Sequence, residues 1–434
     1  MRTIRGRDAA LREVRQRAAH AFGDDVGQAV RRIVDDVRAR GDAAVLDATE
    51  RFDGVRPATL VVPDDVRAAG AARVDDALRA SMERAAARIE AYYARQPTGG
   101  FVASDPAGDA TLGQLIVPVD AAGVYVPGGT APLFSSLLMS AVPARVAGVE
   151  RIVVATPPRA DGTVPDEILL AAALVGVDTV VAAGGAQAIA ALAYGTETLD
   201  GVAVVTGPGN DYVVAAKRQV FGAAGIEALP GPTETLVLAG PDADPHHVAA
   251  DLLAQAEHLG AQPVLVTWSE ALLDATLEAA EAALADLTTE AAARESMERR
   301  GLAVWVEDAD AAMDVANAYA PEHLCLLVDD PWRWLPKVRN AGGVFLGAYS
   351  MEALGDYVAG PSHVMPTGGT ARYASFLNLR HFQKVVPLVS ASPAFVARVG
   401  PDAVRLARAE GLEAHARAVE ARLHEDAADD GTDA

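Results

Sequence analysis

The sequence predicts an α/β protein whose strands form parallel sheets in at least two domains. Its 434 residues exceed the roughly 250 to 300 at which one hydrophobic core stops growing. From about Gln114 onward, short β-branched runs end in Gly or Pro, and an Ala-rich helical stretch follows each of them. This alternation is typical of parallel strands joined by crossover helices. The composition, 51% hydrophobic and 22% charged residues, is ordinary for a globular chain.

The expected elements follow in chain order. Apolar residues at helical spacing predict helices over residues 25–52, with a break at Gly41 and Asp42. Buried strands are expected in RIVVATPP, DTVVAAGG, VAVVTGPG, TLVLAGP and PVLVTWS, then in GLAVWVED, LCLLV and GGVFLG. A boundary between two α/β units is expected near PGPTET. After PSHVMPTGGTARYAS the chain is expected to return to helix, and the acidic tail EDAADDGTDA is expected to be disordered.

The charge balance argues against nucleic acid as a partner. With 59 acidic and 37 basic residues the formal charge is −22, whereas affinity for nucleic acid comes chiefly from Lys and Arg on phosphates. The sequence has neither a signal-peptide core at its start nor an apolar run of about 18 residues, so we expect a cytoplasmic protein with no membrane segment. Cys325 is the only cysteine, so a metal site would use His, Asp, Glu or Gln.

A first candidate site lies in PHHVAADLLAQAEH, a predicted helix with Asp244 as its N-cap. Gln255 and His258 are three residues apart, which places a carbonyl oxygen and an imidazole on one helix face, where both could bind one cation. A polar helix end with no ligand is the alternative for this motif taken alone.

A second candidate is the pair Glu322 and His323 in APEHLCLLV, just before a buried strand. An imidazole can accept a proton near neutral pH, and an adjacent carboxylate can activate water. A hydrogen-bond network in a loop is an equally good interpretation. Cys325, two residues further along, is expected to be a core thiol.

Two further segments contain possible ligands. The Gly- and Pro-rich loop GDYVAGPSHVMPTGG contains Asp356 and His363, and long irregular segments inside α/β proteins often form sites. Glu410 and His415 lie on the last predicted helix, where exposed polar residues of an amphipathic helix are the simpler interpretation.

Three glycine-rich turns, GVYVPGG, AAGGAQAIAAL and TGPGND, stand where strands give way to helices, so their backbone N–H groups could receive phosphate. The dinucleotide motif GxGxxG, the phosphate loop GxxxxGK[ST] and the zinc-protease motif HExxH are all absent from the sequence. Residue patterns alone therefore predict a metal site with an acid/base pair and only suggest a nucleotide site.

Eight blocks in order resemble the histidinol dehydrogenase family over about residues 25–425. They are GVYVPGGTAPLFSSLLM, GGAQAIAALAYGT, TGPGNDYVVAAKRQV, GPTET, LLAQAEH, APEHL, GDYVAGPSHVMPTGGTARY and EGLEAHARAV. The resemblance implies a homodimer that oxidises L-histidinol through the aldehyde to L-histidine with one zinc ion per subunit and two NAD⁺. Two departures are the hydroxyl-preserving Thr233, where many members have serine, and AEHLGAQPV, which is one residue shorter than the usual pattern.

The resemblance also implies roles for particular residues. The implied catalytic pair is Glu322, which would activate water, and His323, which would remove protons. The implied zinc ligands, which also contact substrate, are Gln255, His258, Asp356 and His415, the last supplied by the neighbouring subunit. Further substrate contacts are Thr233, Glu322, His323, His363 and Glu410, and nucleotide contacts are Tyr125, Gln187 and Asn210. Lys217, one of three lysines, is as compatible with a packing role as with a site role.

The implied architecture has two Rossmann-like parallel-sheet domains, one inserted in the other, with helical terminal extensions swapped in a dimer. The expected parts are an N-terminal helical arm of residues 1–22, a first α/β domain of 23–124 and 234–377 with the metal and acid/base residues, an inserted nucleotide-binding domain of 125–233, and a C-terminal helical segment of 378–434.

Three other functions stay open at this stage. A related zinc- and NAD-dependent dehydrogenase could act on another small alcohol such as a sulfonate diol, and a metal-dependent hydrolase could use Glu322 without NAD. A binding or assembly protein is the third, but the full set of polar residues speaks against it.

Overall fold

The computed structural model describes residues 1–15, 24–128, 132–258 and 260–423. The acidic tail, residues 425–434, lies outside these residues. The chain divides into two compact units, Met1–Gln96 with Val119–Phe382, and Pro97–Pro118 with Gln383–Ala434.

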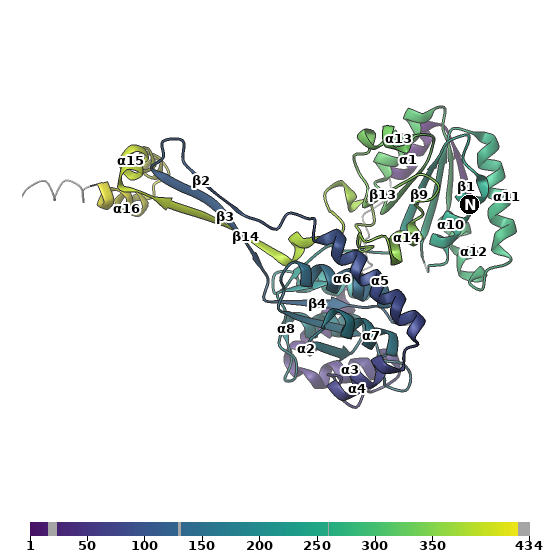
Figure 1. The fold of residues 1–434 in the computed structure, drawn as a ribbon, viewed down its shortest axis with the longest axis horizontal. Helices are drawn as coiled ribbons and strands as arrows, with labels where there is room; N and C mark the ends of the chain where they lie inside the picture. The colour runs from purple at the N-terminus through teal and green to yellow at the C-terminus, as the bar shows by residue number, and fades with distance from the viewer. Residues whose placement is uncertain (16–23, 129–131, 259, 424–434) are drawn as a thin grey trace, which may run out of the picture. The chain divides into compact units, whose positions relative to one another are not determined.

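The first unit contains a six-stranded parallel sheet in the order β1-β11-β10-β9-β12-β13 (Figure 1). Its strands are β1 Arg2–Arg5, β9 Glu234–Ala239, β10 Gln262–Thr267, β11 Leu302–Trp305, β12 His323–Leu327 and β13 Gly343–Leu346. Side chains alternate between its two faces, as the twofold period of a strand requires. Leu236 and Leu238 pack with helices α1 (Arg7–Arg15) and α13 (Ala309–Tyr319), whereas Val237 and Cys325 pack with α10 (Pro245–Ala256) and α11 (Glu270–Leu284). Helix α12 (Glu290–Arg299) covers the outer side of α10.

A five-stranded parallel sheet in the order β6-β5-β4-β7-β8 forms the other half of this unit. Its strands are β4 Ala121–Tyr125, β5 Arg151–Thr156, β6 Thr179–Ala182, β7 Val204–Thr206 and β8 Gly225–Ile226. One face packs on α5 (Asp76–Tyr93), α6 (Phe134–Val146) and α7 (Asp166–Val175). The opposite face packs on α2 (Asp24–Arg40), α3 (Asp42–Asp53), α8 (Gly185–Tyr194) and α9 (Asp211–Val220). Both strand-rich segments expected from the sequence thus form parallel sheets.

The packing of the first 96 residues differs from the expected boundaries. The sequence predicts a helical arm over residues 1–22, but Arg2–Arg5 form the edge strand β1, which pairs with β11, and helix α1 follows it. Residues 16–22 of that arm lie outside the described residues. Helices α2, α3, α4 (Asp64–Arg73) and α5, which we expected to belong with the six-stranded sheet, bury their apolar faces against the five-stranded sheet and its helices. Val34 and Ile89 belong to these two clusters.

The second unit contains an antiparallel sheet in the order β14-β3-β2, with helices α15 (Pro393–Ala409) and α16 (Glu413–Leu423). The strands are β2 Phe101–Ser104, β3 Ala110–Pro118 and β14 Gln383–Ala391. The expected C-terminal segment is therefore not wholly helical, because β14 pairs with β3 along nine residues. Among the described helices, none has the length and apolarity needed to span a bilayer.

Candidate functional site

The metal and acid/base candidates of the first unit gather at the amino-terminal edge of the six-stranded sheet. Thr233 immediately precedes β9, and Glu322 immediately precedes β12, whose first residue is His323. Helix α10 runs back from the far end of β9, so Gln255 and His258 reach this edge at its carboxyl end. The short helix α14 (Glu352–Tyr357) brings Asp356. Charge interactions connect His323 with Asp356, His363 and His258, so the structure brings these four side chains into one neighbourhood.

Thr233 connects the first two candidate sites through its hydroxyl. The hydroxyl donates to Glu322 Oε2 at 2.7 Å and accepts from Gln255 Nε2 at 2.7 Å. Because a carboxylate only accepts, the direction of both bonds is fixed, and the amide of Gln255 must turn its N–H₂ toward Thr233. Its carbonyl oxygen is then directed away from Thr233, as a metal ligand requires.

The ring of His323 is held in one tautomer. Its Nδ1 lies 3.1 Å from the carbonyl oxygen of Glu234, which can only accept, so Nδ1 carries the proton. Nε2 is then the basic nitrogen, and it is buried with no hydrogen-bond partner among the described residues. Burial lowers the pKa of His323 to about 4, which keeps the imidazole neutral at physiological pH. This nitrogen can accept a proton from a substrate.

Glu322 and His363 are also fixed by hydrogen bonds. Glu322 Oε2 accepts from the backbone N–H of Glu234 at 2.9 Å as well as from Thr233. His363 Nδ1 lies 3.0 Å from the carbonyl oxygen of Asp356, and its Nε2 lies 3.0 Å from the hydroxyl of Ser136 on α6. Burial lowers the pKa of His363, so this ring is also neutral.

The donors at this edge fit a zinc ion only in part. An amide oxygen, an imidazole and a carboxylate from Gln255, His258 and Asp356 are ordinary zinc donors, and four are usual. Within the described ranges no group of three or more His, Cys, Asp or Glu side chains could hold a metal ion. A fourth donor from elsewhere would therefore be needed to complete the set.

Glu410 and His415 belong to the second unit. Glu410 directly follows α15, and His415 lies on α16, and both are exposed within the described residues. Their implied roles remain predictions.

The nucleotide candidates lie at the carboxyl-terminal edge of the five-stranded sheet. Tyr125 ends β4, Gln187 lies in the first turn of α8 after β6, and Asn210 follows β7. Ligands of open α/β sheets bind at such edges. The Tyr125 hydroxyl accepts the backbone N–H of Gly185 at 3.1 Å, and Asn210 caps α9 by accepting from the N–H groups of Tyr212 and Val213. These hydrogen bonds fix the glycine-rich turns at Gly185 and at Asn210.

The sequence did not identify three residues that support this chemistry. The Glu234 carbonyl sets the His323 tautomer, and Ser136 holds His363. Glu352 is buried, and its Oε2 lies 3.6 Å from His323 Nδ1. One sequence signal could have identified Glu352. It lies four residues before Asp356 on α14, and this spacing places both carboxyl groups on one face of the helix. Cys325 is a buried core thiol, as expected.

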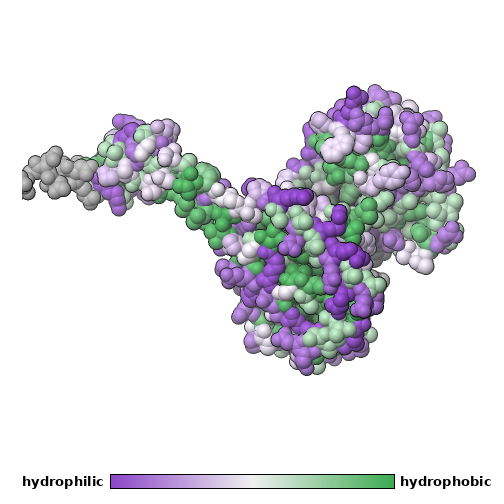
Figure 2. All heavy atoms as spheres, in the orientation of Figure 1, coloured by the Kyte–Doolittle hydropathy of each residue, from purple (hydrophilic) through white to green (hydrophobic). Residues whose placement is uncertain are grey.

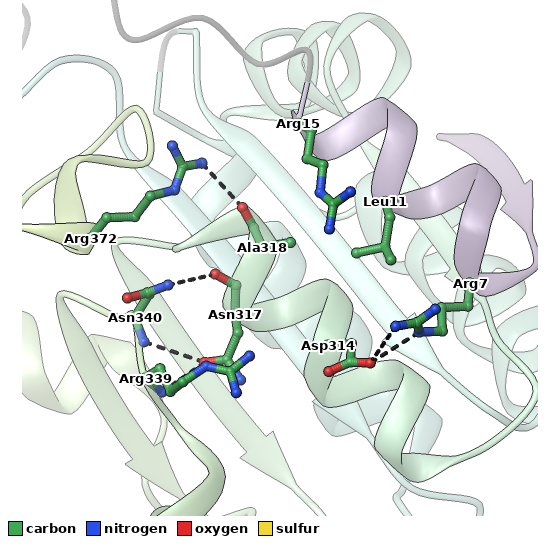
Figure 3. Close-up of a pocket in the computed structure, with 9 residues that line it drawn as sticks. All are labelled: Arg7, Leu11, Arg15, Asp314, Asn317, Ala318, Arg339, Asn340 and Arg372. Carbon is green, nitrogen blue, oxygen red and sulfur yellow. Dashed lines mark hydrogen bonds and ion pairs between the residues drawn. The ribbon is translucent and has the colours of Figure 1, made fainter.

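A surface pocket of about 350 Å³ lies apart from these residues, and none of the predicted site residues lines it (Figure 3). Arg7, Arg15, Arg339 and Arg372 surround it, together with Asp314, which pairs with Arg7 at 2.8 Å. Asn317 shapes one wall, because its side-chain oxygen accepts from the backbone N–H of Arg339 at 2.7 Å. This pocket is basic and exposed.

Comparison with known proteins agrees with the sequence motifs. The family model described as "Histidinol dehydrogenase" matches residues 16–423. Histidinol dehydrogenase of Deinococcus radiodurans is 55% identical over 420 residues, which are 96% of this chain and 94% of that protein. That of Thermus thermophilus is 47% identical over 417 residues, covering 95% of this chain and 99% of the relative. The crystal structure of histidinol dehydrogenase from Elizabethkingia anophelis matches with a TM-score of 0.93 at 34% identity over 99% of each chain.

Proposed function

Because the chain belongs to the histidinol dehydrogenase family, we propose that it oxidises L-histidinol through L-histidinal to L-histidine, with two NAD⁺ and one zinc ion per subunit. The observation that carries the proposal is the buried Nε2 of His323, which has no hydrogen-bond partner in the described part of the chain and lies beside the hydrogen-bonded set of Thr233, Gln255 and Glu322. This arrangement provides a proton acceptor, a carboxylate and an amide ligand at one edge of a sheet.

The zinc ion would be held by Gln255, His258 and Asp356 with the partner's His415. When bound, zinc supplies a Lewis acid that orients the imidazole and amine nitrogens of the substrate. NAD⁺, the hydride acceptor, would meet Tyr125, Gln187 and Asn210, where the N-termini of α8 and α9 suit a pyrophosphate.

His323 removes the alcohol proton at Nε2 during the first oxidation. Its neutral ring and its Nδ1 bond to the Glu234 carbonyl leave that nitrogen ready to accept. Glu322 then takes a proton from the water that attacks the aldehyde, while the protonated His323 returns its proton to the former carbonyl oxygen. Neutral again, His323 takes a proton from the hydrate in the second oxidation. His363 and Glu410 contact the substrate. Thr233, whose hydroxyl already has two partners, acts by holding Gln255 and Glu322.

The second unit supports a homodimer in which each chain lends a ligand to the other. Its strands leave apolar side chains exposed, with Phe101 56%, Val102 66% and Val389 72% accessible. Figure 2 shows apolar surface along the β3 and β14 ribbon. Exposed apolar area of this kind marks an interaction surface. A second copy of the chain would cover it and would bring His415 to the zinc site.

A side-by-side assay of L-histidinol and a sulfopropanediol, following NADH, tests the substrate. We expect histidinol to yield two NADH per molecule consumed, and the diol to yield none. Oxidation of the diol alone would show a related dehydrogenase, and metal-dependent hydrolysis without NAD⁺ would show a hydrolase. Either result would contradict the proposal.

Thr233→Val tests the hydrogen bonds that orient Gln255. The change keeps the shape but removes the hydroxyl, so the Gln255 amide loses its acceptor and Glu322 loses a donor. We expect zinc affinity, measured by chelator competition, to fall roughly 10- to 100-fold, the usual effect of losing a residue that orients a ligand. Thr233→Ser keeps the hydroxyl and should bind zinc like the wild type. Unchanged affinity in the valine variant would remove this role from Thr233.

A further inference from the structure

Lys217 and Glu227 form a fully buried ion pair that the proposed mechanism does not use. Lys217 lies on α9 and Glu227 directly follows β8, and Lys217 Nζ is 2.6 Å from Glu227 Oε1. The two side chains are 0% and 2% exposed. Removing two charges from water is costly, and an apolar pair of similar volume often stabilises a protein as well or better. Stability alone therefore does not account for the pair.

The two side chains of this ion pair form hydrogen bonds with both backbone polar groups of Gly207, its N–H and its C=O. Glu227 Oε1 accepts the backbone N–H of Gly207 at 2.8 Å, and Lys217 Nζ donates to the carbonyl oxygen of Gly207 at 3.0 Å. Gly207 has φ of +114°, and a Cβ atom there would lie 2.0 Å from the carbonyl oxygen of Tyr125. Only glycine can occupy this position, and the ion pair fixes its orientation.

Gly207 begins the turn Gly207–Asn210 that connects β7 with α9. The turn lies at the carboxyl-terminal edge of the five-stranded sheet, against the carbonyl of Tyr125, and ends at the cap residue Asn210. Lys217 lies two helical turns beyond Asn210 on α9. Its bond to the Gly207 carbonyl therefore ties the helix to the turn that precedes it. Burial lowers the pKa of Lys217 and the Glu227 carboxylate opposes that shift, so the charge of the lysine depends on the pair.

We propose that Lys217 and Glu227 are positioning residues that hold the Gly207–Asn210 turn in the shape that binds the nucleotide cofactor. The pair thereby sets the affinity for NAD⁺ without touching the reacting atoms. This inference rests on the proposed function, in which that turn meets NAD⁺.

A comparison of single and double variants separates positioning from packing. Lys217→Met alone leaves a buried carboxylate without its counter-charge and should lower the melting temperature. Lys217→Met combined with Glu227→Met removes both charges, so much of the thermal stability should return. The two hydrogen bonds to the backbone of Gly207 are lost in this variant. We expect this double variant to bind NAD⁺ roughly tenfold or more weakly, the scale of one or two lost hydrogen bonds. Its kcat at saturating NAD⁺, zinc content and KM for histidinol should stay near the wild-type values.

Controls make the result specific. Lys337→Met removes an exposed lysine paired with Asp310 and should leave NAD⁺ affinity unchanged. If the double methionine variant does not fold, Lys217→Met with Glu227→Gln keeps an acceptor for the Gly207 N–H and should lose affinity to a smaller extent. If either folded double variant bound NAD⁺ as tightly as the wild type, this inference would be wrong, but the proposed function would stand. Absence of NAD⁺ binding by the wild type would overturn the proposed function and this inference with it.

Discussion

His323→Ala is expected to lower kcat by roughly two to four decades while zinc stays bound, the usual effect of losing a positioned acid/base group. The Nε2 of His323 is buried with no hydrogen-bond partner among the described residues, so it is free to accept the substrate proton, and alanine removes this acceptor. Glu322→Gln should have an effect of similar size, because the amide keeps the volume but cannot activate water. Steady-state assays at saturating histidinol and NAD⁺ measure both.

Two controls accompany this experiment. His246→Ala changes an exposed histidine on the first turn of α10 and should keep wild-type turnover. Zinc content must be measured in each variant, because metal loss would imitate the loss of a base. If His323→Ala turned over at a near-normal rate with zinc bound, another group would be the base.

A mixed dimer is expected to recover activity that neither parent possesses. One chain carries His415→Ala and the other carries Asp356→Ala, so each homodimer has two sites that lack a zinc ligand. In the mixed dimer one site lacks both ligands and the other is complete, because His415 comes from the opposite chain. The purified heterodimer should therefore show about half the activity of the wild-type dimer, as expected for one intact site of two.

Differently tagged chains allow the heterodimer to be purified and its activity compared with both parents. A dimer in which both chains carry His415→Ala is the matched control and should stay inactive. An inactive heterodimer that still binds NAD⁺ would mean that each subunit builds its zinc site alone.

The sequence predicted the two parallel sheets well because their strands are buried on both faces and read as short β-branched runs. It did not predict β1 or β14. Strand β1, RTIR, is a short edge strand with an arginine at each end and one apolar residue, and β14 contains Pro387 and is exposed over most of its length. Both strands exist through pairing with partners far along the chain, at Leu302–Trp305 and Ala110–Pro118, and local patterns do not reveal such pairing.

Site residues could be predicted where their spacing along the chain fixes their relative positions. Features that depend on contacts between distant segments could not be predicted. Gln255 and His258 share a helix end, and Glu322 and His323 are adjacent, so their types and spacing were informative. The tautomer of His323 depends on a carbonyl group 89 residues away, which no motif encodes. Lys217 was equally compatible with packing and with function, because sequence does not reveal burial, and the structure shows it fully buried against Glu227.

The most direct test of the central claim is a crystal structure of the zinc-loaded dimer, with zinc located by its anomalous signal. We expect one zinc ion per subunit, bound by Gln255, His258 and Asp356 of one chain and by the partner's His415, with Glu322 and His323 beside it. Zinc bound elsewhere, or His415 remote from both copies of His258, would contradict the account.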